Sequence, residues 1–525
     1  MPSVCAAPGE PHDKGCATSR FGAAALLLGG SVLLSRALGY GREALLAYQV
    51  GAQSSTDAYF AAFQIPDLLN YLLAGGALSI AFIPLYARYL SRGDSAGAER
   101  FFATVLGTLG TLAVVSTAML WWWIEPLVAL QFPNFDPPTQ ALTARLTRIV
   151  LPAQIFFIIG GIINAALLAR QRFGAAAAAP LVYNAAIIAG GLLLAPRQGI
   201  GVEGFAWGAL VGAALGPFLA PLLDAQRHIR LRVRVSFGDP AFLQYLAVAA
   251  PLMFGQTLLT VDEWYDRWFG ALLDAGTVAH LSYARRLMQV PVGVVGQAIA
   301  AAALPTLARL WAEGREREFH QLVLRSLRVG LTLAFFSGGA VAVLAPPLVT
   351  LVYQHGAFTP ADTARVAQLL ALFCLAVPAW IGQQIAVRPF YARGDTWRPM
   401  LLGTVIAAAA IPLYLTSARH FGAVGIAAAG VLGMSANALS TILLARWLHG
   451  GPLLLQLLNT TLRSAGIAVV AGVAAYSAVR LAAQAAPGVL MELGAGATIF
   501  VAAVVAGTLA IGDGPMRDAL RRRAK

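Results

Sequence analysis

Long apolar runs recur along almost the whole length of this sequence, and they restrict it to one class of fold. Of its 525 residues, 58% are hydrophobic and only 12% are charged, whereas a soluble domain carries about 25% charged residues. The mean hydropathy is +0.70. A run of about 18 or more apolar residues can cross a hydrocarbon core about 30 Å thick as a helix. The sequence therefore predicts an all-α polytopic membrane protein.

Fourteen apolar segments are long enough to be transmembrane helices. These predicted spans are about 22–50, 57–90, 98–129, 141–169, 176–195, 201–226, 241–273, 278–311, 323–353, 362–392, 398–417, 421–448, 460–484 and 488–511. Basic residues gather in alternate connections: "RHIRLRVRVSFGD" (227–239) holds four arginines, whereas "VGAQSST" (50–56) and "DAGTVAH" (274–280) hold none. Cytoplasmic loops carry an excess of Lys and Arg, so both termini are predicted to be cytoplasmic. The same loop distribution accounts for the net charge of +13 without a nucleic-acid partner.

An internal repeat relates the two halves of the chain. Arg42, Gly51 and Pro66 recur as Arg267, Gly276 and Pro291, each 225 positions further on. "PLYARYL" (84–90) is answered by "PTLARLW" (305–311) after one further turn of slippage. Because six spans separate the copies, the halves share one orientation and are parallel repeats about an axis along the membrane normal. Transporters place substrate at the interface of such halves.

The repeat predicts two six-helix lobes related by pseudo-two-fold symmetry, followed by two C-terminal helices. The predicted divisions are a polar cytoplasmic leader (1–21), an N-lobe of spans 1–6 (22–228), a C-lobe of spans 7–12 (229–450), spans 13–14 (451–512) and a basic cytoplasmic tail (513–525).

Charged residues fall inside the predicted spans of both halves. A charge at the centre of a bilayer costs about 2.5–3.5 kcal/mol on insertion scales. The first two spans nevertheless contain Arg36, Arg42, Glu43 and Asp57, and "SSTD" (54–57) has the pattern of a capping box. The corresponding spans of the second half contain Asp262, Glu263, Asp266, Arg267, Arg285 and Arg286.

These charges have two interpretations. Arginine at a span end can simply extend to the interface, Asp266 and Arg267 can form a structural pair, and Glu43 can act as a counter-charge to Arg36 on the same helix face. Clustering in equivalent spans of both halves instead favours two walls of one polar cavity, since charged residues in spans mark substrate pathways. Several arginines facing a cavity suit an anionic substrate, because the guanidinium fork matches phosphate oxygens.

No catalytic or metal-binding pattern is present. The sequence has no Walker A motif, no nucleophile elbow and no HExxH. Its three cysteines, Cys5, Cys16 and Cys374, have no metal-ligand company. We therefore expect neither an enzyme nor a bound metal or cofactor.

Several longer motifs resemble one known family. The segment "SRALGYGREALLAYQVGAQSSTDAYFAAFQIPDLL" (35–69) resembles the N-terminal signature of the MurJ/MviN lipid II flippases. "YARRLMQVPVGVVGQAIAAAALPTLARL" (283–310), "YQHGAFTPADT" (353–363) and "FYARGDTWRP" (390–399) resemble its later signatures. The resemblance covers about residues 22–450. It implies a fold of the multidrug/oligosaccharidyl-lipid/polysaccharide exporter (MOP) superfamily, with two lobes around a cationic cavity and a lipid-tail groove at spans 13–14.

The resemblance also implies a substrate and a mechanism. The family moves undecaprenyl-pyrophosphate-linked peptidoglycan precursor, lipid II, from the cytoplasmic to the periplasmic leaflet by alternating access. Its important positions map here to Arg36, Arg42, Asp57 and Arg286. The arginines are expected to meet the pyrophosphate, and Asp57 to gate or orient the cavity. Arg285, next to Arg286, is a further candidate for substrate binding. Candidate cavity or gating residues are Glu43, Asn70, Asp266 and Arg267.

The chain departs from the family pattern at several positions. Where many members have Arg and Glu in span 2, this chain has Asn70 or Tyr71 and Gly75. The acidic residue that often precedes the span 8 arginine is Arg285 here. Some members join an Asp matched by Asp266 to Asn or Asp of span 11 in a sodium site. Span 11 here reads "LLGTVIAAAAIPLYL" and has neither.

The expected setting is the bacterial cytoplasmic (inner) membrane, with membrane lipids and cell-wall synthesis proteins as further partners. Two other functions are also compatible with the sequence. One is a flippase for another polyprenyl-linked glycan, such as an O-antigen or capsule unit, and the other is a non-transporting membrane scaffold.

Overall fold

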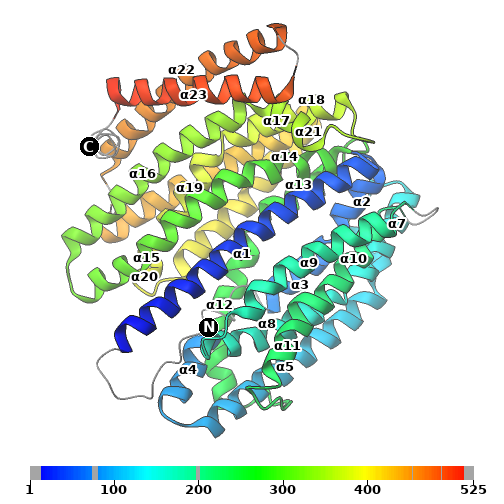
Figure 1. Cartoon of the computed structure of the whole chain (residues 1–525), viewed down its shortest axis with the longest axis vertical. Helices are drawn as coiled ribbons and strands as arrows, with labels where there is room; N and C mark the ends of the chain where they lie inside the picture. Colours follow the sequence, from blue (N-terminus) through cyan, green and yellow to red (C-terminus); the bar gives the residue numbers. More distant parts are fainter. Residues whose placement is uncertain are drawn as a thin grey trace, which may run out of the picture. The chain divides into compact units, whose positions relative to one another are not determined.

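The computed structural model describes residues 13–73, 81–196, 201–259, 261–451, 453–485 and 488–512. Within these ranges all regular structure is helical (Figure 1). Helices satisfy every backbone N–H and C=O group internally, which a segment inside lipid requires. The all-α class predicted from the apolar runs is confirmed.

The N-terminal half contains twelve α-helices and one π-helix, labelled η2, in the described residues. They are α1 (Asp13–Val50), α2 (Ser54–Ala62), α3 (Gln64–Leu73), α4 (Ile83–Ser91), α5 (Ser95–Trp122), α6 (Ile124–Gln131), α7 (Pro137–Val150), α8 (Ala153–Ala169), α9 (Gly174–Leu193), α10 (Glu203–Ala213), η2 (Ala214–Leu219), α11 (Ala220–Ala225) and α12 (Pro240–Leu259).

The C-terminal half continues in the same way, with a second π-helix directly after Pro291. Its helices are α13 (Val261–Gly270), α14 (Thr277–Pro291), η3 (Val292–Gly296), α15 (Gln297–Ala312), α16 (Glu316–Val343), α17 (Ala345–Tyr353), α18 (Pro360–Cys374), α19 (Val377–Ala386), α20 (Arg388–Ala392), α21 (Trp397–His449), α22 (Leu454–Ala485) and α23 (Val489–Ile511).

Nine helical stretches of the described chain are long and apolar enough to cross a membrane. A tenth is obtained if Pro360–Cys374 and Val377–Ala392, bent by 40°, count as one span. The 53-residue helix α21 covers two predicted spans and is interrupted at Gly422, whose φ of 58° and ψ of −139° are not helical. The protein is thus a multi-pass membrane protein, and the number fourteen stays a prediction.

Two predicted divisions fall partly or wholly outside the described residues. The leader 1–21 is described only from Asp13, where α1 begins. The basic tail 513–525 lies outside the described residues, as does Gly75.

Contacts between helices divide the chain into two compact units. Unit 1 comprises Met1–Leu45, Ile65–Trp123 and Leu146–Met253, and unit 2 comprises Leu46–Gln64, Ile124–Arg145 and Phe254–Lys525. The segment from Leu46 to Gln64 therefore belongs with the C-terminal helices although it lies early in the sequence. The lobe boundaries expected from the repeat remain a prediction.

A stripe of glycines holds together part of unit 1. Gly204, Gly208, Gly212 and Gly216 recur every fourth residue through α10 and η2, so they share one helix face. A Cβ at Gly208 would lie 2.7 Å from the carbonyl oxygen of Ala186, within α9. Small residues at this spacing let membrane helices approach closely without a hydrophobic driving force.

Polar side chains join α16 to α22 in unit 2. Arg328 Nε donates to Thr460 Oγ1 at 3.1 Å, and the hydroxyls of Thr332 and Ser464 lie 3.3 Å apart. α22 in turn packs along α23, as Figure 1 shows at one end of this unit. These contacts attach the last two long helices to the rest of unit 2.

Candidate functional site

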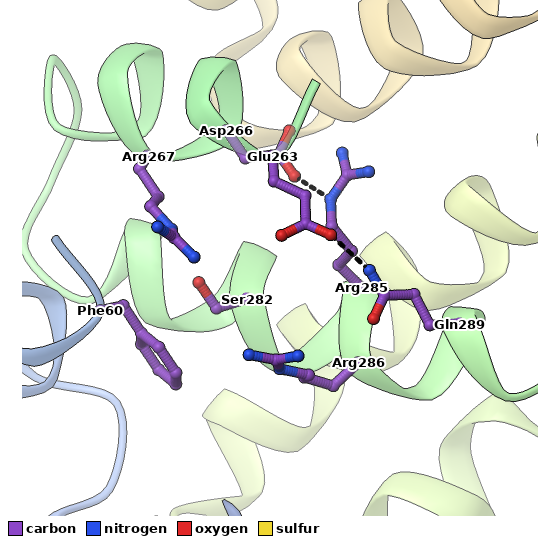
Figure 2. Close-up of a pocket in the computed structure, with 8 residues that line it drawn as sticks. All are labelled: Phe60, Glu263, Asp266, Arg267, Ser282, Arg285, Arg286 and Gln289. Carbon is purple, nitrogen blue, oxygen red and sulfur yellow. Dashed lines mark hydrogen bonds and ion pairs between the residues drawn. The ribbon is translucent and has the colours of Figure 1, made fainter. Parts of the chain in front are cut away.

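A polar pocket lies between α13 and α14 of unit 2. Its lining residues are Phe60, Glu263, Asp266, Arg267, Ser282, Arg285, Arg286 and Gln289 (Figure 2). The space among them is about 320 Å³ when its open mouth is included.

Helical spacing places the charges of α13 on two neighbouring faces. Asp262 and Asp266 are four residues apart, as are Glu263 and Arg267, and residues four apart lie above one another on a helix. α14 contributes Arg285 and the next residue along the chain. The pocket thus has one wall with both signs of charge and one wall that is cationic.

Arg285 is held between two carboxylates of α13. Its Nη1 donates to Asp262 Oδ2 at 2.7 Å, and its Nε donates to Asp266 Oδ2. The guanidinium lies 4.7 Å from the centre of the Phe373 ring, within range of a cation–π contact. Arg285 is 5% exposed. This arginine is therefore an internal cation paired with two carboxylates of α13.

Tyr414 of α21 completes this arrangement. Its hydroxyl donates to Asp262 Oδ1, and its ring stacks on Phe269 with centres 5.4 Å apart. Tyr265 donates to the carbonyl oxygen of Ala407 at 3.0 Å, which gives α13 a second tie to α21. The aromatic residues fix the face of α13 that bears Asp262.

A second set of charged residues in the pocket comprises Glu263, Arg267 and Arg286, and Arg267 is buried. Glu263 Oε1 accepts a hydrogen bond from Gln289 at 2.6 Å and is attracted by both arginines. Figure 2 shows these side chains converging from α13 and α14. Arg286 is half-buried, whereas Arg285 beside it is buried. Counted together, Asp262 and the pocket's charged residues balance, with three arginines against three carboxylates.

Asp57 binds the N-terminus of α14. Its Oδ2 accepts the Gly276 amide at 2.6 Å and its Oδ1 accepts the Ala279 amide at 2.7 Å. Asp57 is 2% exposed, and the positive end of a helix stabilises a carboxylate placed there. The predicted capping box is wrong: α2 begins after Gln53 with no side-chain cap, because the Asp57 carboxylate is used by another helix.

The backbone also makes close contacts at Gly51 and Gly276. We call these contacts and the two Asp57 hydrogen bonds together the Asp57 clasp. Gly51 and Gly276, the repeat-related glycines, have φ of 76° and 88°, which favour glycine. A Cβ on Gly51 would lie 2.6 Å from the carbonyl oxygen of Ala357, and one on Gly276 would lie 2.5 Å from that of Ala52. Both glycines are thus required for close backbone approach.

The predicted residues of unit 1 form separate contacts. Arg42 forms an ion pair with Glu43 at 2.6 Å and donates to Asn184 Oδ1 at 3.3 Å. Asn184 Nδ2 donates to Ser35 Oγ at 3.1 Å, which ties α9 to α1. Glu43 is buried and Arg36 is half-buried.

Asn70 also lies in unit 1. Its Nδ2 donates to Gln154 Oε1 at 2.8 Å, joining α3 to α8. The structure therefore brings Asp266, Arg267, Arg285 and Arg286 together, while Arg36, Arg42, Glu43 and Asn70 lie in the other unit. Substrate binding by any of them stays a prediction.

Four participants were not predicted from the sequence. Phe60, Ser282 and Gln289 line the pocket, and Tyr414 orders it. A helical spacing argument could have found Gln289, which lies three residues after Arg286. Nothing in the sequence links Tyr414 to Asp262, because 152 positions separate them.

The Arg285 arrangement predicts a stability effect that distinguishes two adjacent arginines. Arg285→Ala leaves Asp262 and Asp266 buried without their cation, and breaking a buried ion pair costs about 3–5 kcal/mol. We expect a clearly lower thermal unfolding midpoint in detergent, partly restored by millimolar guanidinium chloride or by Asp266→Ala in the same chain. Arg286→Ala is the control and should change the midpoint little. Equal midpoints for both variants would contradict this role.

The Asp57 clasp predicts local protection of α14. Asp57→Asn has the same size but removes one acceptor and the charge, and hydrogen bonds to charged groups contribute about 1.5–3 kcal/mol. Amide exchange in a peptide covering residues 274–280 should therefore accelerate by roughly ten-fold or more. Asp94→Asn is a matched control, since Asp94 caps its own helix, α5. Unchanged exchange in Asp57→Asn would exclude the clasp.

Comparison with known proteins matches this chain to one family. The family model for lipid II flippase MurJ matches residues 46–496. A probable lipid II flippase MurJ of Rhizobium meliloti (strain 1021) is 30% identical over 421 residues, covering 78% of each chain. The lipid II flippase MurJ of Burkholderia cenocepacia is 30% identical over 386 residues, covering 72% of this chain and 74% of that protein.

Solved structures show the same fold. A lipid II flippase MurJ in an inward closed conformation superposes with a TM-score of 0.77 at 20% identity, covering 94% of this chain and all of that one. An inward-facing multidrug resistance transporter of the MATE family, in the MOP superfamily, gives 0.68 at 14% identity over 78% of this chain and 94% of the other. On the family model and the relatives at 30% identity, the chain belongs to the MurJ lipid II flippase family.

Proposed function

We propose that this protein translocates lipid II from the cytoplasmic to the periplasmic leaflet of the bacterial inner membrane by alternating access. The observation that carries the proposal is the pocket between α13 and α14, where Arg267 and Arg286 converge beside an arginine already neutralised by two carboxylates. The family match over residues 46–496 supplies the substrate class.

The pocket chemistry suits the pyrophosphate of lipid II. A guanidinium presents parallel N–H donors that match two phosphate oxygens. Arg286 and Arg267 are attracted to Glu263 in this structure. An entering pyrophosphate offers these arginines a stronger anion, while Arg285 stays with Asp262 and Asp266. We assign the remaining contacts with the pyrophosphate to Arg36 and Arg42.

The balanced charge of the site follows from its membrane setting. Unpaired charge inside a bilayer is unfavourable by several kcal/mol, so an empty pocket is more stable when carboxylates compensate its arginines. Glu263 is the counter-ion we assign to the empty state. Substrate binding then replaces the Glu263 carboxylate by the pyrophosphate as the anion beside Arg267 and Arg286, so each arginine keeps an anionic partner.

The Asp57 clasp is the element we assign to gating. It binds the N-terminus of α14, the helix that carries Arg285 and Arg286. Its contacts are hydrogen bonds to backbone amides and close backbone approaches at glycines, and Phe60 of α2 packs edge-on against Tyr283 of α14 beside them. Opening and closing of this clasp is how we expect the outer side of the pathway to be controlled.

The direction of transport agrees with the membrane potential. We expect both termini to lie in the cytoplasm, because cytoplasmic connections carry an excess of arginine. Moving one charge through the potential is worth about 2.3 kcal/mol per 100 mV. An anionic headgroup moving outward across an inside-negative membrane is therefore driven by the potential, without a bound metal ion in the scheme.

Replacement of individual arginines tests the site. Arg36→Ala and Arg286→Ala should each abolish rescue of a bacterium depleted of its own lipid II flippase, because each removes a pyrophosphate contact. Protein levels in the membrane, measured by immunoblot, should stay normal. Arg309→Ala, which replaces an exposed arginine in the last turn of α15, is the control and should rescue fully.

Two outcomes would contradict the proposal. Full rescue by both Arg36→Ala and Arg286→Ala would remove these residues from the substrate path. Failure of the unaltered chain to rescue lipid II transport, with rescue of O-antigen or capsule export, would replace the substrate by another polyprenyl-linked glycan.

A further inference from the structure

The connection between α11 and α12 contains an unusual basic segment, IRLRVRVSF, residues 229–237, which we call the basic strap. Arg230 to Ser236 form neither helix nor strand. The strap alternates arginine with apolar residues and plays no part in the pocket or the Asp57 clasp. All its contacts described below lie within unit 1.

The strap is fixed along α5 by its backbone. The Arg234 amide donates to the carbonyl oxygen of Ala103 at 3.0 Å, and the Ser236 amide donates to Thr108 Oγ1 at 3.2 Å. The two acceptors are five residues apart, about 7.5 Å along a helix axis. Two extended residues cover roughly 6.8 Å, so the strap runs along α5 as an extended chain.

Gly107 makes this close contact possible. It lies between the two acceptors, and a Cβ there would be 2.4 Å from the carbonyl oxygen of Arg234 and 2.8 Å from its nitrogen. No larger residue fits without moving the strap. Because Gly107 belongs to α5, one of the membrane-spanning stretches, the strap is held against a transmembrane helix rather than free in solution.

Two side chains of the strap pack against the core, and the others are exposed. Ile229 is 5% exposed, and Leu231 packs on the same core cluster of α4, α5 and α8. Arg230, Arg232 and Arg234 are exposed at every second position. The apolar side chains between and beyond them are exposed as well: Val233 74%, Val235 50% and Phe237 54%.

The exposed arginines of the strap form only weak ion pairs. Arg230 lies 3.9 Å from Glu99, and Arg234 lies 3.5 Å from Asp239, with both arginine side chains about half exposed or more. Exposed ion pairs of this kind contribute about 0–1 kcal/mol. They leave the guanidinium groups available to a stronger anion.

We propose that the basic strap binds the headgroups of anionic phospholipids such as phosphatidylglycerol. The physical match has two parts. Exposed Val233, Val235 and Phe237 favour the boundary between headgroups and acyl chains, and arginines at a membrane surface attract anionic lipid and hydrogen-bond phosphate. A loop that only sets topology needs the charges but not a fixed backbone or exposed apolar side chains.

Lipid-specific quenching of a probe on the strap tests the proposal directly. Val233→Cys, in a chain whose Cys5, Cys16 and Cys374 are replaced by Ala, is labelled with bimane and placed in nanodiscs. Brominated phosphatidylglycerol or brominated phosphatidylcholine is present at equal mole fraction. We expect about five-fold or greater preference for the anionic lipid, which corresponds to the usual attraction of at least one arginine to an anionic surface.

Charge-removing variants and salt identify the cause of that preference. Arg230→Gln/Arg232→Gln/Arg234→Gln should abolish it. Arg309→Gln/Arg315→Gln/Arg317→Gln removes the same charge from the end of α15, the short connection that follows it and the start of α16, and should preserve the preference. If the first triple variant does not fold, raising the salt to about 1 M, where the Debye length is near 3 Å, should abolish the preference in the chain with its arginines intact.

Three results would overturn the proposal. They are equal quenching by both lipids at low salt, loss of preference in the control triple variant, and displacement of brominated phosphatidylglycerol by a few mole per cent of lipid II, which would make the strap part of the substrate path. The transport function is tested separately. Lipid II transport with equal quenching contradicts the strap alone, whereas lipid preference without transport contradicts the proposed function alone.

Discussion

The ion pairs between Arg285 and the two aspartates of α13 are the interaction on which the candidate site depends. A bilayer penalises each uncompensated charge, yet α13 and α14 carry six charged residues within a short distance. Arg285 pairs with Asp262 and Asp266, and Tyr414 fixes the geometry from α21. Arg267 and Arg286 then lie with Glu263 in the same pocket, and Glu263 is the carboxylate that we propose an incoming anion replaces.

The Asp57 clasp connects this site to a segment far away in sequence. Asp57 binds the N-terminus of α14, and the segment 46–64 that contains Asp57 belongs to the same compact unit as α13 and α14. Gly51 and Gly276 have matching left-handed backbones at repeat-related positions. The repeat thus explains why a glycine with a left-handed backbone occurs at both positions, and the clasp physically links the segment that we propose as a gate to the helix that bears the arginines.

The sequence predicted the broad architecture because that depends on local properties. Apolar run length predicted helices that span a membrane, and the clustering of charge in spans 7 and 8 predicted Asp266, Arg267, Arg285 and Arg286 in one polar set. Long-range partners could not be predicted in this way. Tyr414 reaches Asp262 only through the packing of α21 on α13, and the capping box predicted at "SSTD" is wrong because Asp57 caps a helix 219 residues further on. The two carboxylate partners of Arg285 could not be predicted either, and substrate binding by Arg285 stays a prediction.

Leaflet-resolved detection of lipid II tests the central claim most directly. The measurement uses cells whose only lipid II flippase is this chain, with externally added reagent that modifies lipid II solely in the outer leaflet of the inner membrane. The account predicts outer-leaflet lipid II while the chain is present, and its loss on depletion of the chain or on collapse of the membrane potential. Continued appearance of lipid II in the outer leaflet after depletion, or its absence while the chain is present in the membrane at normal level, would contradict the account.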